Sequence, residues 1–161
     1  MSFRHEPRRP DSTLLVVADR GQARLFSAPW PELEPLTELS GMVHPEGRLR
    51  EHDTVSDRAG RFRTPSGQRT GAEQATDFRH QTAQEFAREV CERLEAARLQ
   101  NEFGRLVLVA PALFLGELRQ QRSPELKKLT VAEVNLDLVH ASVETIGSRV
   151  VEAFQSVDVN E

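Results

Sequence analysis

The residues best suited to chemistry in this chain are arginines that gather near its middle. Residues 58–72 contain four arginines and no aspartate or glutamate, and further arginine lies upstream. The candidate binding residues are Arg48, Arg58, Arg61, Arg63 and Arg69. Guanidinium groups pair with phosphate oxygens, and such pairing supplies most of the nonspecific affinity of proteins for nucleic acid. The segment therefore predicts phosphate contacts, although a net charge of -4 argues against a uniformly basic nucleic-acid binder.

The same segment contains a polar stretch, "TPSGQRTG" (64–71), with no aliphatic residue to anchor it. Its centre, Ser66-Gly67-Gln68, consists of residue types that favour turns and loops. Phe62 lies between two arginines and has two open interpretations. Its ring could stack on an RNA base, as aromatic side chains do with single strands, or it could pack the segment against the body.

Carboxylates suggest a second kind of site, a two-metal nuclease centre. Asp19 ends a hydrophobic run, and Glu85 or Glu89 could face it from a helix. The run "LVLVA" (106–110), however, has no acidic residue where such a centre needs one. We therefore interpret Asp19 as a turn residue before Arg20-Gly21 and the two glutamates as part of a solvated helix face.

Histidine and cysteine give no metal site or disulfide. His44, His52 and His80 are irregularly spaced, and the single cysteine, Cys91, is best interpreted as a small core side chain. His44 is expected to help end a strand, and His80 either bridges to the neighbouring loop or faces water. We expect no metal and no cofactor, and because no nucleophile–base pair can be assembled, we do not expect an enzyme.

Hydrophobic periodicity predicts strands and helices on either side of a long loop. Apolar residues at positions 83, 86, 87, 90, 94 and 97 recur at helical spacing, and Thr76 or Asp77 could cap that helix. No such pattern occurs over 45–76, a loop of roughly thirty residues that should project from the body or be disordered. The predicted strands cover 13–19, 22–28, 36–44, 105–111 and 129–138, and further helices cover 112–121 and 142–154.

This element order predicts an α/β fold. The first two strands form a hairpin, and the later strands must be parallel because helices connect them. A three-strand meander followed by alternating helices and strands is the order of a ribonuclease H-like mixed sheet. A flavodoxin-like fold is the alternative if the third strand is absent.

Length and composition suit one domain. The chain has 161 residues, of which 38% are hydrophobic, which is enough for one core. We expect a flexible segment over 1–12, a single domain over 13–155 and a tail over 156–161. No apolar run suits a signal peptide or a membrane span of about eighteen residues, so we predict no membrane association and a cytoplasmic location.

Several stretches resemble the bacterial family labelled "protein required for attachment to host cells". The resemblance covers about Leu14 to Leu138 and is specific in the mixture of His44 to Arg48 with Asp57 to Arg61. The stretches are "LLVVADRGQARLF", "VHPEGRLREHDTVSDRAGR", "RHQTAQEFAREVCERLEAAR" and "FGRLVLVAPALFLGELR".

That family resembles the central, ribonuclease H-like domain of archaeal and eukaryotic class 1 release factors. In those factors a Gly-Gly-Gln tip precedes a long helix and promotes peptidyl-tRNA hydrolysis. Ser66-Gly67-Gln68 occupies the corresponding place, which makes Gln68 the one catalytic candidate. Ser66 replaces the first glycine and so removes backbone freedom that the tip requires, which predicts a module without hydrolase activity.

Two hypotheses follow. The first is a module that binds RNA or the ribosome through the arginine-bearing loop. The second is an interaction or regulatory protein whose loop binds a protein partner and so affects attachment to host cells.

Overall fold

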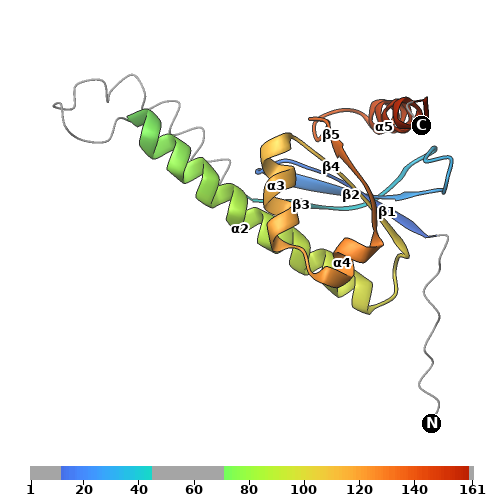
Figure 1. Ribbon diagram of the computed structural model, residues 1–161, viewed down its shortest axis with the longest axis horizontal. Helices are drawn as coiled ribbons and strands as arrows, with labels where there is room; N and C mark the ends of the chain where they lie inside the picture. Colours follow the sequence, from blue (N-terminus) through green and yellow to red (C-terminus); the bar gives the residue numbers. More distant parts are fainter. Residues whose placement is uncertain (1–11, 45–70, 160–161) are drawn as a thin grey trace, which may run out of the picture.

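The computed structural model describes residues 12–44 and 71–159, which form five strands and four helices (Figure 1). The strands are β1 (Thr13–Ala18), β2 (Gln22–Ala28), β3 (Thr37–Val43), β4 (Arg105–Ala110) and β5 (Thr130–Asn135). The helices are α2 (Gly71–Leu99), α3 (Ala112–Gln121), α4 (Pro124–Leu129) and α5 (Val143–Val159).

The five strands form one mixed sheet in the order β3-β2-β1-β4-β5. β1 pairs antiparallel with β2 and parallel with β4, β2 pairs antiparallel with β3, and β4 pairs parallel with β5. The predicted hairpin, parallel later strands and mixed α/β sheet are therefore confirmed. Because β3 is present, the flavodoxin-like alternative is wrong, whereas the ribonuclease H-like name for this sheet stays a prediction.

Helices cover both faces of the sheet. Alternate residues of β1 point to opposite sides, as strand geometry requires, so Leu14 and Val16 pack with α2, α3 and α4 while Leu15 and Val17 pack with α5. All six residues of β1 are buried. This two-sided burial explains why β1 and β4 are nearly continuous aliphatic runs.

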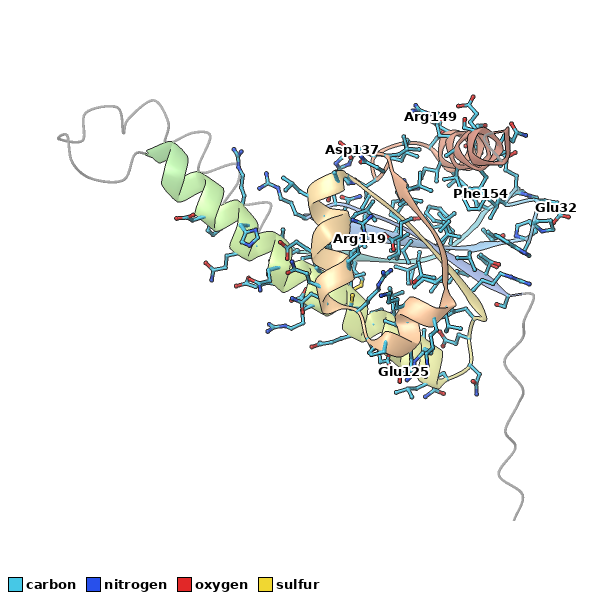
Figure 2. The ribbon with its side chains drawn as sticks, in the orientation of Figure 1. Glu32, Arg119, Glu125, Asp137, Arg149 and Phe154 are labelled. Atoms are coloured by element: carbon cyan, nitrogen blue, oxygen red, sulfur yellow. The ribbon has the colours of Figure 1, made fainter. Side chains whose placement is uncertain are left out.

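On the second face, α5 packs against the connection between β2 and β3. Phe154, labelled in Figure 2, meets Trp30 edge to face with 6.2 Å between the ring centroids. Gly147 lies close to Glu34. The connection is thereby held against α5 rather than left as an independent loop.

Helix α2 is longer than its apolar pattern predicts. Its 29 residues correspond to a rod of about 43 Å. Ala83, Phe86, Val90 and Leu94 are buried, whereas Asp77, His80 and Gln81 are exposed. Figure 1 shows the first part of the helix extending past the sheet.

The predicted start of this helix is wrong. We expected residues up to 76 to belong to the loop and Thr76 or Asp77 to cap the helix, but the helix already includes residues 71–76. The run Ala72 to Ala75 consists of good helix formers, so propensity continues the helix beyond the last core contact. Hydrophobic periodicity does not indicate these first turns of α2, because they do not pack against the core and so have no regularly spaced apolar residues.

One further helix and two further boundaries differ from expectation. Helix α4 was not predicted: Ser123 caps it by accepting a hydrogen bond from the Leu126 N–H at 3.1 Å, and Pro124 occupies its first turn. Only Leu126 in it is buried, so no period was visible. The strand predicted over 129–138 is confined to Thr130–Asn135, and α5 runs to Val159 through residues expected in the tail.

Candidate functional site at the carboxyl edge of the sheet

The residues that the sequence selected for binding lie outside the described residues. Arg48, Arg58, Arg61, Arg63 and Arg69 all fall within 45–70, together with the Ser66-Gly67-Gln68 tip, Phe62 and His52. The structure does describe the two points to which this segment is attached. One is His44, directly after β3, and the other is Gly71, the first residue of α2.

His44 and several other polar side chains lie at one edge of the sheet. β1, β3 and β4 point the same way, because β1 and β4 are parallel and β2 is antiparallel to both β1 and β3. Their carboxyl ends therefore lie together. The chain leaves β1 toward β2 and leaves β4 toward β5, in opposite directions across the sheet. Such a switch point is where open α/β sheets commonly bind ligands.

Asp19 organises the turn after β1. Its Oδ1 accepts hydrogen bonds from the N–H of Gly21 at 2.8 Å and of Gln22 at 2.9 Å. Its Oδ2 lies 3.8 Å from Nε2 of the exposed His140. The interpretation of Asp19 as a turn residue is confirmed.

Glu85 and Glu89 face His44. Their Oε2 atoms lie 3.8 Å from Nε2 and 3.6 Å from Nδ1 of the imidazole. The carboxylates considered for a metal centre are thus distributed between two separate histidines. Within residues 12–44 and 71–159, no group of three or more His, Cys, Asp or Glu side chains could hold a metal ion.

His44 is buried and closes the end of β3. Its backbone N–H donates to the carbonyl oxygen of Gly21 at 2.9 Å, and its ring stacks on Phe86 with 5.3 Å between centroids. Phe86 in turn lies 5.9 Å from Phe114 of α3. Nε2 of His44 is buried and has no hydrogen-bond partner in the described part of the chain. The rings of His44, Phe86 and Phe114 therefore form a continuous aromatic row that links the end of β3 to α3.

His80 and Glu117 link α2 to α3. Nδ1 of His80 lies 3.2 Å from Oε1 of Glu117, and the Glu117 side chain is only 9% exposed. Its Oε2 is buried without a partner among the residues described. Sequence reasoning missed Glu117, although its position beside Phe114 and Leu118 on one face of an amphipathic helix could have revealed it.

Arg20 follows Asp19 in the turn after β1, and Arg79 lies on α2. Burial lowers the pKa of Arg20, the positive charge of Arg79 lowers it further, and the charge of Asp19 acts in the opposite direction. Nε of Arg79 is buried and makes no hydrogen bond within the described ranges. The sequence analysis selected neither residue, because neither belongs to the arginine-rich segment.

The fold and this edge lie within the span of a recognised family. Residues 14–150 match the family described as "Protein required for attachment to host cells". The chain belongs to this host attachment family. The match extends from β1 into α5 and so includes the sheet, apart from Thr13, and its carboxyl edge.

Comparison with solved structures adds distant likenesses for this host attachment protein. One structure is titled "Archaeal protein", with 10% identity, a TM-score of 0.42, and coverage of 94% of this chain and 40% of the other. Another is an archaeal translation termination factor, aRF1, with 10% identity, a TM-score of 0.46, and coverage of 94% and 41%. The chain thus spans about two fifths of the length of either protein. No curated protein matches.

Other groups in this host attachment protein have structural roles. Burial raises the pKa of the Cys91 thiol to about 12, and the thiol lies 3.7 Å from the carbonyl oxygen of Leu118. Arg24 on β2 donates to the carbonyl oxygens of Val139 and Ala141 and pairs with Glu38 at 2.9 Å. None of the described helices is long and apolar enough to cross a membrane.

Proposed function

We propose that this host attachment protein is a cytoplasmic module that associates with RNA or the ribosome through its arginine-bearing segment, without hydrolysing peptidyl-tRNA. The observation that carries the proposal is the position of Gly71. It begins a helix whose first turns extend beyond the sheet (Figure 1). The segment is therefore attached to the body at His44 and to the outer end of α2 at Gly71.

The length of the outer part of α2, residues 71–81, supports this function. Gly71 lies about 18 Å further along the helix axis than Ala83, the first core residue of α2, at 1.5 Å per residue. The end of the helix is therefore available to a large partner without disturbing the core. Residues 58–72, which lead into it, combine arginines with an absence of acidic residues, as phosphate contact requires.

The proposed lack of hydrolysis rests on the tip. Ser66 carries a Cβ where the release-factor tip has glycine, so the backbone conformations open to glycine are restricted. Gln68 remains the one side chain whose loss would test chemistry there. We expect Gln68→Ala to leave ribosome association unchanged.

Cosedimentation with ribosomes tests the proposal. The wild-type chain should pellet with ribosomes at low salt and be released at high salt, because phosphate contacts weaken with salt. The fourfold variant with Arg58, Arg61, Arg63 and Arg69 replaced by Ala should stay in the supernatant. Replacement of the exposed Arg88, Arg93, Arg119 and Arg149 by Ala provides a control with the same change in net charge. If wild type never pellets, or the fourfold variant pellets as wild type does, the RNA function is wrong.

A second candidate function, binding a protein partner, is favoured by the edge strand β3. Leu39 and Val43 on this strand are 57% and 54% exposed, and the strand has a neighbour in the described sheet on one side only. An exposed edge offers backbone hydrogen-bonding groups to an added strand of a partner. Leu39→Lys and Val43→Lys should abolish such binding while leaving ribosome cosedimentation intact.

A further inference from the structure

Helix α2 is tied to the elements beside it by two contacts between histidine and carboxylate that the proposed function does not use. In the first joint, His44 at the end of β3 faces Glu85 and Glu89 of α2. In the second joint, His80 of α2 faces Glu117 of α3. We propose that these two joints form a proton-sensitive attachment of α2, which tightens when the histidines become charged in weak acid and loosens above neutral pH.

The first joint sets a buried imidazole against two carboxylates on successive turns of one helix. Oε2 of Glu85 lies 3.8 Å from Nε2 of His44, and Oε2 of Glu89 lies 3.6 Å from Nδ1. Residues four apart project from the same face of a helix, so both carboxylates reach the same ring. Each ring nitrogen thus faces its own carboxylate, and both nitrogens carry a proton only in the charged form of the ring.

The surroundings of His44 leave the neutral ring incompletely paired. Its side chain is 8% exposed, and its Nε2 is buried with no hydrogen-bond partner in the part of the chain that the structure describes. Stacking on Phe86 and the backbone hydrogen bond to Gly21 hold the residue in place. Because a buried polar atom without a partner costs free energy, a charged ring that draws Glu85 toward Nε2 offsets part of that cost.

The second joint has the opposite arrangement, with a buried carboxylate and an exposed histidine. The side chain of Glu117 is 9% exposed and that of His80 is 68% exposed. Nδ1 of His80 lies 3.2 Å from Oε1 of Glu117, whereas Oε2 is buried with no partner within residues 12–44 and 71–159. Burial disfavours an ionised carboxylate unless a cation lies beside it, and His80 supplies that cation only when its ring is charged.

Both joints hold the stretch in which α2 leaves the body. They involve residues 80–89 of α2, and the buried face of the helix begins in the same stretch, at Ala83. Residues 71–81 extend past the sheet (Figure 1). Loosening the joints therefore changes how firmly the outer part of α2 is held, while the apolar stripe of the helix stays packed.

Other charged groups on these elements limit the response without removing it. They are Asp19 and Arg20 in the turn after β1, Asp77, Arg79 and Arg88 on α2, and Arg119 on α3. Asp19 accepts hydrogen bonds from the N–H groups of its own turn, and Arg119 pairs with Glu133 of β5. The positive charges on the turn and on α2 disfavour a charged histidine nearby, whereas the carboxylates of the two joints favour it.

The sign of the pH dependence follows from these charges. Histidine changes charge between about pH 5 and 8, whereas glutamate stays ionised down to about pH 4. The attached form places carboxylates beside the rings, so it binds protons more readily than a form in which the joints are open. Attachment is therefore strongest at about pH 5 to 6, weakens as the pH rises through neutrality, and weakens again below about pH 4 as the carboxylates are protonated.

Hydrogen exchange of the full chain, resolved by residue at about pH 5.5 and about pH 7.5, tests this attachment. Protection of the amides of residues 78–85 is compared with that of the amides of β4, after correction for intrinsic exchange rates, so that changes in global stability cancel. We expect the relative protection of 78–85 to be about two- to fivefold higher in weak acid, the range of partly exposed ion pairs. Added salt should reduce the difference by screening.

Two variants remove one joint each. Glu85→Gln with Glu89→Gln removes the carboxylates of the first joint, and His80→Gln removes the histidine of the second. The replaced side chains are 40%, 47% and 68% exposed, so both variants should fold. Each should reduce the response to pH, and their combination should abolish it. Glu92→Gln with Glu144→Gln, at two exposed positions, changes net charge as the first variant does and should respond as wild type does.

The outcomes decide the proposal separately from the proposed function. Equal relative protection at the two pH values in wild type would overturn it. A full wild-type response in either joint variant would also overturn it, because the response would then come from other groups. Circular dichroism of each variant confirms that it is folded. Ribosome cosedimentation tests residues outside both joints, so either proposal can fail while the other holds.

Discussion

Glu117 on α3 is a buried carboxylate whose partner, His80 of α2, is itself largely exposed. One oxygen faces His80, and the other has no partner in the described part of the chain. Such an arrangement does little for stability, because the desolvation of the carboxylate is offset by one contact.

Replacing Glu117 by Leu should therefore raise the free energy of unfolding by about 1 kcal/mol, since a well-packed apolar side chain needs no hydrogen bonds. His80→Ala should instead lower it by about 1 kcal/mol or more by leaving the carboxylate alone. Urea unfolding measures both. A Glu117→Leu protein less stable than wild type would show that the pair contributes net stability.

Cys91 gives a pH dependence with a definite sign. Burial raises its pKa from 9.0 to about 12, so the folded protein retains the thiol proton at pH values where the unfolded chain has lost it. Its contribution to stability is complete below about pH 9 and is lost as the pH rises toward 12. Urea unfolding at pH 8 to 11 should show a decline that Cys91→Ala reduces. An equally steep decline in Cys91→Ala would assign the effect to other groups.

At the scale of elements, α2 joins two regions with different roles. From Ala83 to Ala97 it contributes a buried stripe to the core, and over residues 71–81 it extends past the sheet. Amides in the outer part should exchange hydrogen much faster than those from 86 to 94, because opening the outer turns exposes little apolar surface. Hydrogen exchange resolved by residue measures this. Equal protection along all of α2 would mean that the outer turns have a partner in solution.

Two glycines within helices, Gly116 and Gly147, test whether local packing or helix propensity determines the effect of a Gly→Ala substitution on stability. A Cβ at Gly116 of α3 would have nothing within 4 Å, whereas one at Gly147 of α5 would lie 2.9 Å from Oε1 and 3.1 Å from Cγ of Glu34. Gly116→Ala should stabilise the protein by up to about 1 kcal/mol through helix propensity alone. Gly147→Ala should increase the free energy of unfolding by less, because the Glu34 side chain must move to make room for the new Cβ. Urea unfolding of the two variants side by side gives the difference, and the opposite order would contradict it.

At the scale of the whole molecule, we expect the arginine-bearing segment to determine RNA binding and the rest of the chain to determine stability. If about three or four arginines each neutralise one phosphate, the slope of log affinity against log salt should be roughly -2 to -4. The fourfold arginine-to-alanine variant should flatten this slope while its thermal midpoint stays within about 1 °C of wild type, because surface arginines in general contribute little to folding. Filter binding across a salt series and a thermal scan measure the two quantities. A large fall in the midpoint would show that the segment is part of the folded core.

Much of the fold can be predicted from the sequence, because a buried face of a helix or strand requires apolar residues at regular spacing. The bounds of β2 and α3 agree with their predicted ranges, and the stripe from Ala83 to Ala97 marks α2. Elements with little burial left no period, so α4, anchored by Leu126 alone, and the first turns of α2 were missed. The same limit applies to the candidate site, where His80 and Glu117 are separated by 37 positions and no motif connects them.

The sequence by itself determined the five strands, the presence of α2, α3 and α5, and the concentration of arginine before α2, since each is a property of neighbouring residues. Only the tertiary structure decided that His80 pairs with Glu117, that His44 stacks on Phe86, and that Glu85 and Glu89 face His44 rather than Asp19. These contacts depend on strand order and on the direction in which α2 crosses the sheet. Both are set by the packing of distant apolar residues, which local sequence does not encode.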